Sequence, residues 1–122
     1  MRSILVLIFG LILIGALSCD YKYIEPIIVE IPDTGEPVSF TNDVEPIFQP
    51  KCTSCHASRS PILTTGNAYN SLMGGGYVDT ENPEESIIYV KGASGHPGGS
   101  KALTAEELAW ILKWIEEGAA NN

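Results

Sequence analysis

The sequence predicts an all-α domain over residues 39–122, built from about four short helices. Three observations support this prediction: apolar residues recur at helical spacing, capping residues or prolines precede the apolar stretches, and strand signals after residue 40 are weak. At 122 residues the chain has room for a single domain. Because four short helices enclose little apolar volume, such a domain is expected to need a staple, a metal or a cofactor.

The first two helices are expected to be short. Segment 44–48 carries apolar residues at i, i+3 and i+4 spacing behind possible cap residues at 41–43. This pattern predicts a helix that ends at Pro50. A second helix is expected over residues 67–73, where the glycines at 74–76 stop it.

The last two helices have clearer boundaries. An N-cap residue followed by proline, Asn82–Pro83, predicts the start of a third helix that runs to about Lys91. The fourth begins at Thr104, which forms a capping box with Glu107, and it ends at Gly118.

The first 18 residues have the pattern of a secretory signal peptide. Arg2 precedes 14 uncharged residues at 4–17, a run shorter than the roughly twenty needed to span a bilayer as a helix. The sequence ALSC at 16–19 resembles the lipobox of bacterial lipoproteins. The resemblance implies cleavage after Ser18 and lipidation of Cys19, which would anchor the protein to a membrane of the bacterial envelope. The alternative is an ordinary signal peptide with a chance cysteine.

Residues 19–38 are expected to form an acidic, extended tether, because they contain three prolines and five carboxylates. Removal of residues 1–18 deletes one cation, Arg2, and no anion. The remaining chain carries 6 basic and 15 acidic side chains, a formal charge of −9. Such a polyanion is not expected to bind nucleic acid.

The sequence CTSCH at 52–56 is the attachment signature of c-type haem. Each of the two thiols, Cys52 and Cys55, would add across one vinyl group of a single haem. A helical turn between them would direct His56 toward the iron as its proximal ligand. We expect the other ring nitrogen of His56 to donate to a backbone carbonyl in the following loop, with that of Pro61 as the candidate.

Three other interpretations of the two cysteines compete with haem. A redox-active disulfide would normally follow a strand in a βαβ unit, and no such unit is predicted. A structural zinc ion could take Cys52, Cys55 and the two histidines, although adjacent Cys55 and His56 would reach one small ion awkwardly. The third alternative is a structural disulfide that closes a small, strained loop.

The candidates for a distal iron ligand are Met73, His96 or a lysine. Met73 lies on the predicted second helix, and we expect it mainly to pack in the core against the haem or its neighbours; iron ligation by Met73 is the runner-up. His96 lies in a glycine-rich loop at 92–99 that is long enough to cross the opposite haem face. Because Pro97 stiffens this segment, we favour His96 as the distal ligand.

Three phrases in order resemble the small monohaem cytochromes c of the class I type: FTNDVEPIF at 40–48, NPEESIIY at 82–89 and WIEEGA at 114–119. The resemblance implies a cytochrome c-like fold around one covalent haem c. Where many members carry Met-Pro in the distal loop, this chain has His96–Pro97, which implies bis-histidine iron. It also implies that the first and last helices cross, with contacts among six apolar residues: Val44, Ile47, Phe48, Trp110, Ile111 and Trp114.

These features predict an electron carrier rather than an enzyme. Both axial iron positions would be filled, and two imidazoles favour a lower reduction potential than a methionine–histidine pair. The acidic pairs at 84–85, 106–107 and 116–117 are most simply solvated helix faces; the alternative is that they steer a basic redox protein partner. The alternative functions are a haem-based redox or gas sensor with a displaceable His96, or a zinc-binding structural lipoprotein.

Overall fold

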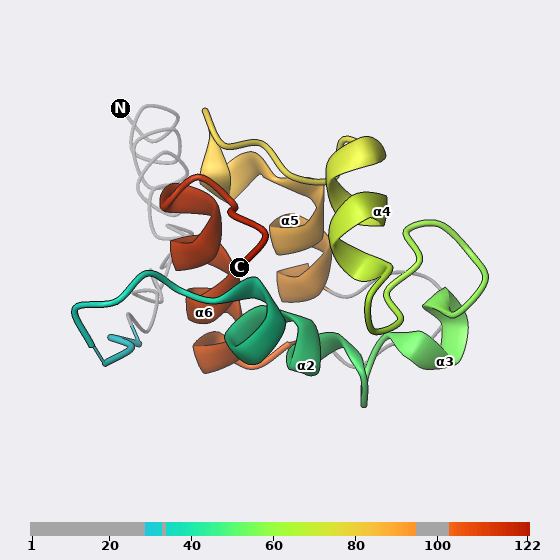
Figure 1. The fold of residues 1–122 in the computed structure, drawn as a ribbon, viewed down its shortest axis with the longest axis horizontal. Helices are drawn as coiled ribbons and strands as arrows, with labels where there is room; N and C mark the ends of the chain where they lie inside the picture. The colour runs from blue at the N-terminus through green and yellow to red at the C-terminus, as the bar shows by residue number, and fades with distance from the viewer. Residues whose placement is uncertain (1–28, 33, 95–102) are drawn as a thin grey trace, which may run out of the picture.

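The computed structural model describes residues 29–32, 34–94 and 103–122, and in these ranges it contains helices and no β-strand (Figure 1). The prediction of an all-α fold is confirmed for this part of the chain. In chain order the helices are the π-helix η1 (Phe40–Val44), α2 (Glu45–Phe48), α3 (Thr53–His56), α4 (Ala68–Gly74), the 3₁₀-helix η2 (Pro83–Glu85), α5 (Ile87–Ser94) and α6 (Ala105–Glu116).

The first predicted helix is present, but it starts earlier than expected. Ser39 is the N-cap of η1, and its hydroxyl accepts a hydrogen bond from the N–H of Asn42 at 3.2 Å. In return the N–H of Ser39 donates to the carboxylate of Asp43 at 2.8 Å. The cap therefore lies outside the expected positions 41–43, and η1 continues into α2 with Pro46 in the first turn.

The third predicted helix is divided at Ser86, so the expectation of one continuous helix from 82 to 91 is wrong. Ser86 has φ −52° and ψ 129°, which separates η2 from α5. Its hydroxyl is buried, accepts from the N–H of Asp79 at 2.9 Å and donates to the Asp79 carbonyl at 3.2 Å. These two hydrogen bonds compete with helical hydrogen bonding and stabilise the non-helical backbone conformation at Ser86.

Replacing Ser86 with alanine should therefore lower the free energy of unfolding by about 1 kcal/mol, because the partly buried N–H and carbonyl of Asp79 would lose their partner. Chemical denaturation would measure the change. Thr80→Ala removes a hydroxyl from an exposed position in the same loop and should alter stability by less than about 0.5 kcal/mol. Equal effects of the two substitutions would contradict this account of Ser86.

The last helix begins as predicted. The Thr104 hydroxyl accepts from the N–H of Glu107 at 3.2 Å, and the Glu107 carboxylate accepts from the N–H of Thr104 at 2.7 Å. α6 ends at Glu116, and Gly118 then adopts φ +97°, a conformation that favours glycine.

The core forms where α6 crosses η1 and α2, and the predicted crossing is confirmed. Phe40 and Trp114 pack with ring centroids 5.0 Å apart, and Tyr69 of α4 meets Phe40 edge-on at 5.3 Å. Ile47 and Trp110 are partly buried against the core. The buried apolar residues are Val38, Phe40, Val44, Phe48, Leu63, Ala68, Leu72, Leu103, Ile111, Trp114, Ile115 and Ala119.

The end of the predicted tether belongs to the folded unit. Val38 is 4% exposed, and its N–H donates to the Glu117 carboxylate at 2.7 Å. Its carbonyl accepts from the side-chain amide of Asn122 at 3.3 Å, while the Asn122 backbone carbonyl accepts from the N–H of Thr41 at 3.0 Å. The C-terminal residues therefore bind the start of η1.

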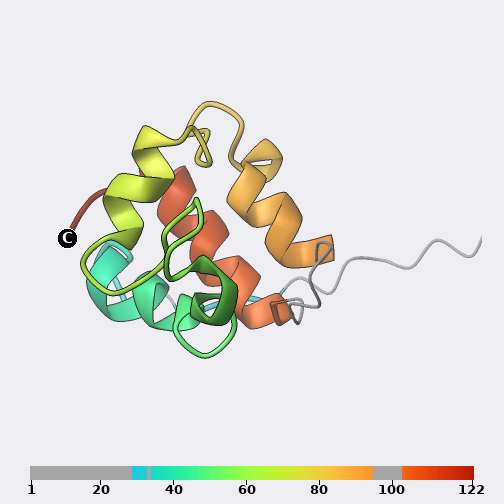
Figure 2. The same ribbon diagram turned by 90° about the vertical axis from the view of Figure 1, so that its right-hand side faces the viewer.

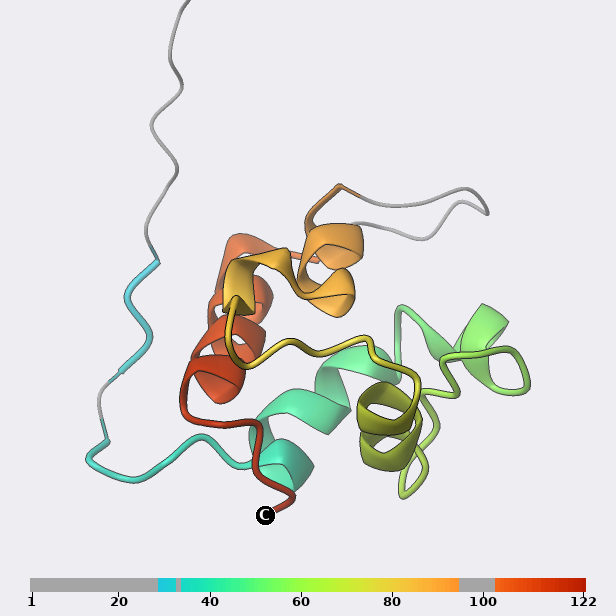
Figure 3. The ribbon, with the colours of Figure 1, turned by 90° about the horizontal axis from the view of Figure 1, so that it is seen from above.

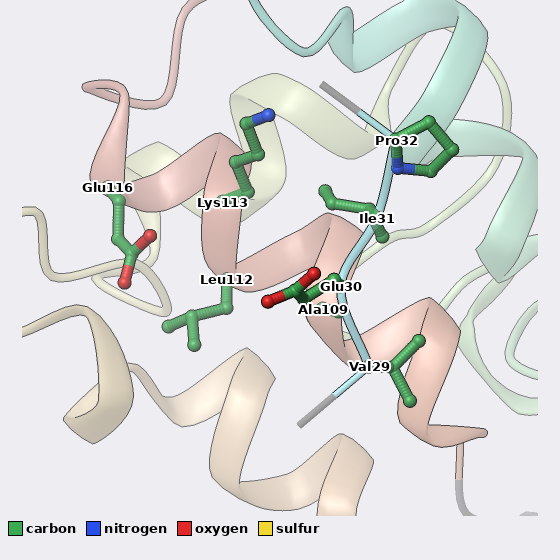
Figure 4. A pocket seen from close by; sticks show the side chains of 8 residues that line it. All are labelled: Val29, Glu30, Ile31, Pro32, Ala109, Leu112, Lys113 and Glu116. Atoms are coloured by element: carbon green, nitrogen blue, oxygen red, sulfur yellow. The ribbon is translucent and has the colours of Figure 1, made fainter. Parts of the chain in front are cut away.

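The preceding segment runs beside α6, at the end of the molecule away from α3 (Figures 1 and 3). Residues 29–32 and α6 together line an open cavity of about 590 Å³ (Figure 4), with Leu112 and Lys113 on the helix side. Residues 29–32 are not in a strand or a helix, as expected for the extended tether. Within the described ranges, no helix has the length and apolarity needed to cross a membrane.

Candidate functional site

The CTSCH segment forms one helical turn, as the sequence predicts. The N–H groups of Cys55 and His56 both donate to the carbonyl of Cys52, at 3.1 and 2.9 Å. The N–H of Cys52 in turn donates to the carbonyl of Phe48 at 2.8 Å, which joins the turn to the end of α2. Since Phe48 is fully buried, this hydrogen bond fixes the motif to the core. Figure 2 shows α3 and its loop from the side.

The His56 ring is oriented by the loop that follows it. Nδ1 lies 2.8 Å from the carbonyl oxygen of Pro61 and 3.2 Å from that of Arg59. The expected hydrogen bond to Pro61 is therefore confirmed. Because carbonyl oxygens only accept, Nδ1 carries the proton, and in the neutral ring the lone pair lies on Nε2. The N–H of Leu63 donates to the His56 carbonyl at 2.8 Å and closes the loop.

Both cysteines of the motif are free thiols; Cys52 is partly buried and Cys55 is exposed. Burial raises the pKa of the Cys52 thiol, the negative charge of Glu107 raises it further, and the charge of Lys51 opposes the shift. The thiol is thus protonated at neutral pH. Redox-active Cys-x-x-Cys pairs depend instead on a thiol with a lowered pKa, so this environment disfavours disulfide exchange.

An ion pair connects the motif to α6. The Lys51 ammonium lies 2.5 Å from the Glu107 carboxylate, which also accepts the capping hydrogen bond from Thr104. Partial burial raises the pKa of Glu107, but the hydrogen bonds from Lys51 and Thr104 and the charge of Lys51 outweigh burial and hold it below its ordinary value. The sequence contains no signal that pairs these residues across 56 positions.

The Glu107 contribution to stability should therefore depend on pH. A carboxylate with a lowered folded-state pKa stabilises the fold fully above its unfolded value, which is 4.5 for Glu107, and loses this effect as pH falls through the folded value. Glu107→Gln should lower the free energy of unfolding by about 0.5–1 kcal/mol at pH 7. Urea denaturation at pH 7 and pH 3 should show the difference between wild type and variant shrinking at pH 3; a constant difference would contradict the prediction.

Met73, the runner-up distal ligand, lies near the end of α4 and is 37% exposed. Met73 is therefore outside the polypeptide core, and its expected packing against the haem or its neighbours stays a prediction. It is one of three exposed large apolar side chains in the described ranges, with Ile87 and Val90 of α5.

His96, the favoured distal ligand, and Cys19, the predicted lipidation site, lie outside the residues that the structure describes. Gly92 and Leu103, which lie on either side of His96 in the sequence, are joined by a hydrogen bond. The N–H of Leu103 donates to the carbonyl of Gly92 at 2.8 Å. A β-carbon at position 92 would lie 2.8 Å from the end of the Leu103 side chain, so a larger residue there would require this side chain to shift.

The residues of this site fit a covalently attached haem. Two free thiols stand on one helical turn, an oriented imidazole follows directly, and apolar side chains on α4 and α5 are left exposed. Within residues 29–32, 34–94 and 103–122, no group of three or more His, Cys, Asp and Glu side chains is arranged to hold a metal ion. The zinc interpretation also requires His96, which is outside these ranges.

Comparison with known proteins gives one informative match. The chain is 28% identical to hydrazine synthase subunit alpha from Kuenenia stuttgartiensis over 130 aligned positions. The match covers 71% of this chain but 16% of that subunit, so the chain spans about a sixth of its relative. No family model matches the sequence, and no solved structure matches it.

Proposed function

We propose that this protein is a monohaem cytochrome c that carries single electrons while anchored to an envelope membrane by a lipid on Cys19. Cys52 and Cys55 would form the thioether bonds to haem, and His56 and His96 would be the proximal and distal iron ligands. The observation that carries the proposal is the position of His56 Nδ1, 2.8 Å from the Pro61 carbonyl and directly after a turn with two free thiols.

This hydrogen bond has a chemical role in the proposal. Histidine ligands of metals commonly donate their second ring N–H to a carbonyl, which fixes the tautomer and increases the basicity of the ligating nitrogen. Pro61 would do so for His56 and leave the Nε2 lone pair for iron. Bound haem would supply a one-electron Fe(III)/Fe(II) couple.

Electron transfer follows from the ligand set. With His56 and His96 as its ligands, a bound haem iron would have no open site for a substrate or for oxygen, so the site would exchange electrons by an outer-sphere reaction. The similarity to hydrazine synthase subunit alpha covers about a sixth of that subunit, and we propose no hydrazine chemistry for this chain.

The test is the visible spectrum of full-length protein produced in a host that matures c-type cytochromes. We expect a red protein with a sharp ferrous α-band, and colour that stays with the polypeptide after acid-acetone extraction. The spectrum should be low-spin in both oxidation states, and carbon monoxide should not bind the reduced protein at neutral pH. A colourless protein that contains stoichiometric zinc would overturn the proposal, and carbon monoxide binding would favour the sensor.

A further inference from the structure

The peptide group between Pro61 and Ile62 is hydrogen-bonded at both of its ends. Its carbonyl oxygen, which belongs to Pro61, lies 2.8 Å from His56 Nδ1 and accepts from it. Its N–H, which belongs to Ile62, donates to the hydroxyl oxygen of Ser71 at 2.7 Å. Because Ser71 lies on α4, a single planar amide joins a side chain of that helix to the imidazole of the CTSCH segment.

The hydrogen bond to Ser71 strengthens the one to His56. An amide whose N–H donates a hydrogen bond becomes a better acceptor at its carbonyl oxygen, because consecutive hydrogen bonds polarise one another. The distance of 2.7 Å between Ile62 N and Ser71 Oγ is at the short end of the range for N–H···O hydrogen bonds. Ile62 and Ser71 are both partly buried, so the surrounding protein screens this bond less than water would.

Two other side chains hold the same loop, through peptide groups other than the one that accepts from His56 Nδ1. The side-chain amide of Gln49 donates to the Leu63 carbonyl at 3.2 Å. The buried Glu45 carboxylate accepts from the N–H of Gly66 at 2.8 Å. These contacts fix the course of the loop toward α4, whereas the Ser71 hydroxyl binds the peptide group that orients the imidazole.

We propose that Ser71 is a positioning residue for the proximal iron ligand: through the Pro61–Ile62 peptide it strengthens the hydrogen bond from His56 Nδ1 and lowers the reduction potential of the haem iron. This inference rests on the proposed cytochrome function. A stronger hydrogen bond at Nδ1 increases the basicity of Nε2, and a more basic ligand favours ferric iron. Ser71 would also keep the Pro61 oxygen closer to Nδ1 than the Arg59 oxygen, which lies 3.2 Å away.

The test compares Ser71→Ala with Ser71→Thr in the full-length, haem-loaded protein. Alanine removes the hydroxyl oxygen that accepts from the Ile62 N–H, whereas threonine keeps it. We expect Ser71→Ala to raise the reduction potential by about 28 mV, which is a threefold change in the one-electron equilibrium constant. Ser71→Thr should stay within about 10 mV of the wild type, a 1.5-fold change. A redox titration followed in the visible spectrum would measure both.

A second measurement follows the His56 proton itself. Low-spin ferrous haem is diamagnetic, so the Nδ1–H proton of His56 can be observed by NMR in isotopically labelled, reduced protein. Ser71→Ala should move this resonance upfield and increase the rate of its exchange with solvent several-fold, because the Pro61 carbonyl becomes a weaker acceptor. Ser71→Thr should leave both the position and the exchange rate of the resonance close to those of the wild type.

Gln49→Ala is the matched control, because it releases the same loop at Leu63 and leaves both hydrogen bonds of the Pro61–Ile62 peptide in place. It should lower the free energy of unfolding, as Ser71→Ala does, but keep the potential within about 10 mV of the wild type. Equal shifts in Ser71→Ala and in either Gln49→Ala or Ser71→Thr, or no shift in Ser71→Ala, would overturn the inference alone. A preparation that contains no haem would overturn the proposed function and this inference with it.

Discussion

Replacing both Cys52 and Cys55 by alanine should abolish covalent haem attachment completely. Among the residues that the structure describes, Cys52 and Cys55 are the cysteines, and both are free thiols. They lie on a single helical turn. Without them no sulfur remains in that turn to add to the haem vinyl groups. Haem staining after denaturing electrophoresis should be lost, and the pyridine haemochrome spectrum should move to the position of ordinary haem b or disappear.

The single substitutions should differ from the double one. Either remaining thiol could form one thioether, so Cys52→Ala and Cys55→Ala should each retain some covalent haem with a shifted α-band. Ser58→Ala is the matched control, since Ser58 is exposed in the loop after the motif, whereas the Ser54 hydroxyl donates to the sulfur of Cys55 at 3.9 Å. Haem that stays covalently bound in the double variant would show that the attachment site is elsewhere.

Loss of haem should also lower stability. A ligand that binds only the folded state stabilises it by RT ln(1 + [L]/Kd), and a covalent cofactor cannot dissociate from the native chain. The exposed Met73, Ile87 and Val90 indicate apolar surface that the polypeptide does not cover by itself. We therefore expect the double variant to unfold at lower denaturant concentration than the haem-loaded protein.

The parts of the fold that sequence analysis predicted correctly depend on local signals. The capping box of Thr104 and Glu107 fixed the start of α6 within one residue, and the glycines after position 73 located the end of α4. The spacing of Cys52, Cys55 and His56 required a helical turn, and the structure has one. Each of these signals acts between residues at most a few positions apart.

The features that were missed depend on contacts between distant segments. The pairing of Lys51 with Glu107 and the hydrogen bond from Val38 to Glu117 join positions 56 and 79 residues apart, and no periodicity encodes them. The break at Ser86 was missed for a different reason. The Ser86 hydroxyl forms hydrogen bonds with the backbone of Asp79, seven residues earlier, and these bonds compete with the helix. The sequence Asn82–Pro83 is a favourable helix start and gives no sign of them.

The second large effect concerns the distal ligand. Substitution His96→Met should keep the haem low-spin and raise its reduction potential by more than about 59 mV, a tenfold change in the one-electron equilibrium constant. Methionine sulfur favours ferrous iron, whereas imidazole is the stronger donor and stabilises ferric iron. Axial ligands tune haem potentials over roughly 0.8 V, so a shift of this size is well within their range. Spectroelectrochemical titration would measure it.

Two further variants separate ligation from indirect effects. His96→Ala should produce a high-spin or water-ligated ferric haem that binds carbon monoxide when reduced. Met73→Leu should leave both the spin state and the potential unchanged, because Met73 is at the exposed end of α4 and is not the proposed ligand. If His96→Met leaves the potential unaltered in a low-spin, haem-loaded protein, His96 does not bind the iron. A high-spin Met73→Leu variant would then assign the distal position to Met73, because sulfur would have been the ligand from the start.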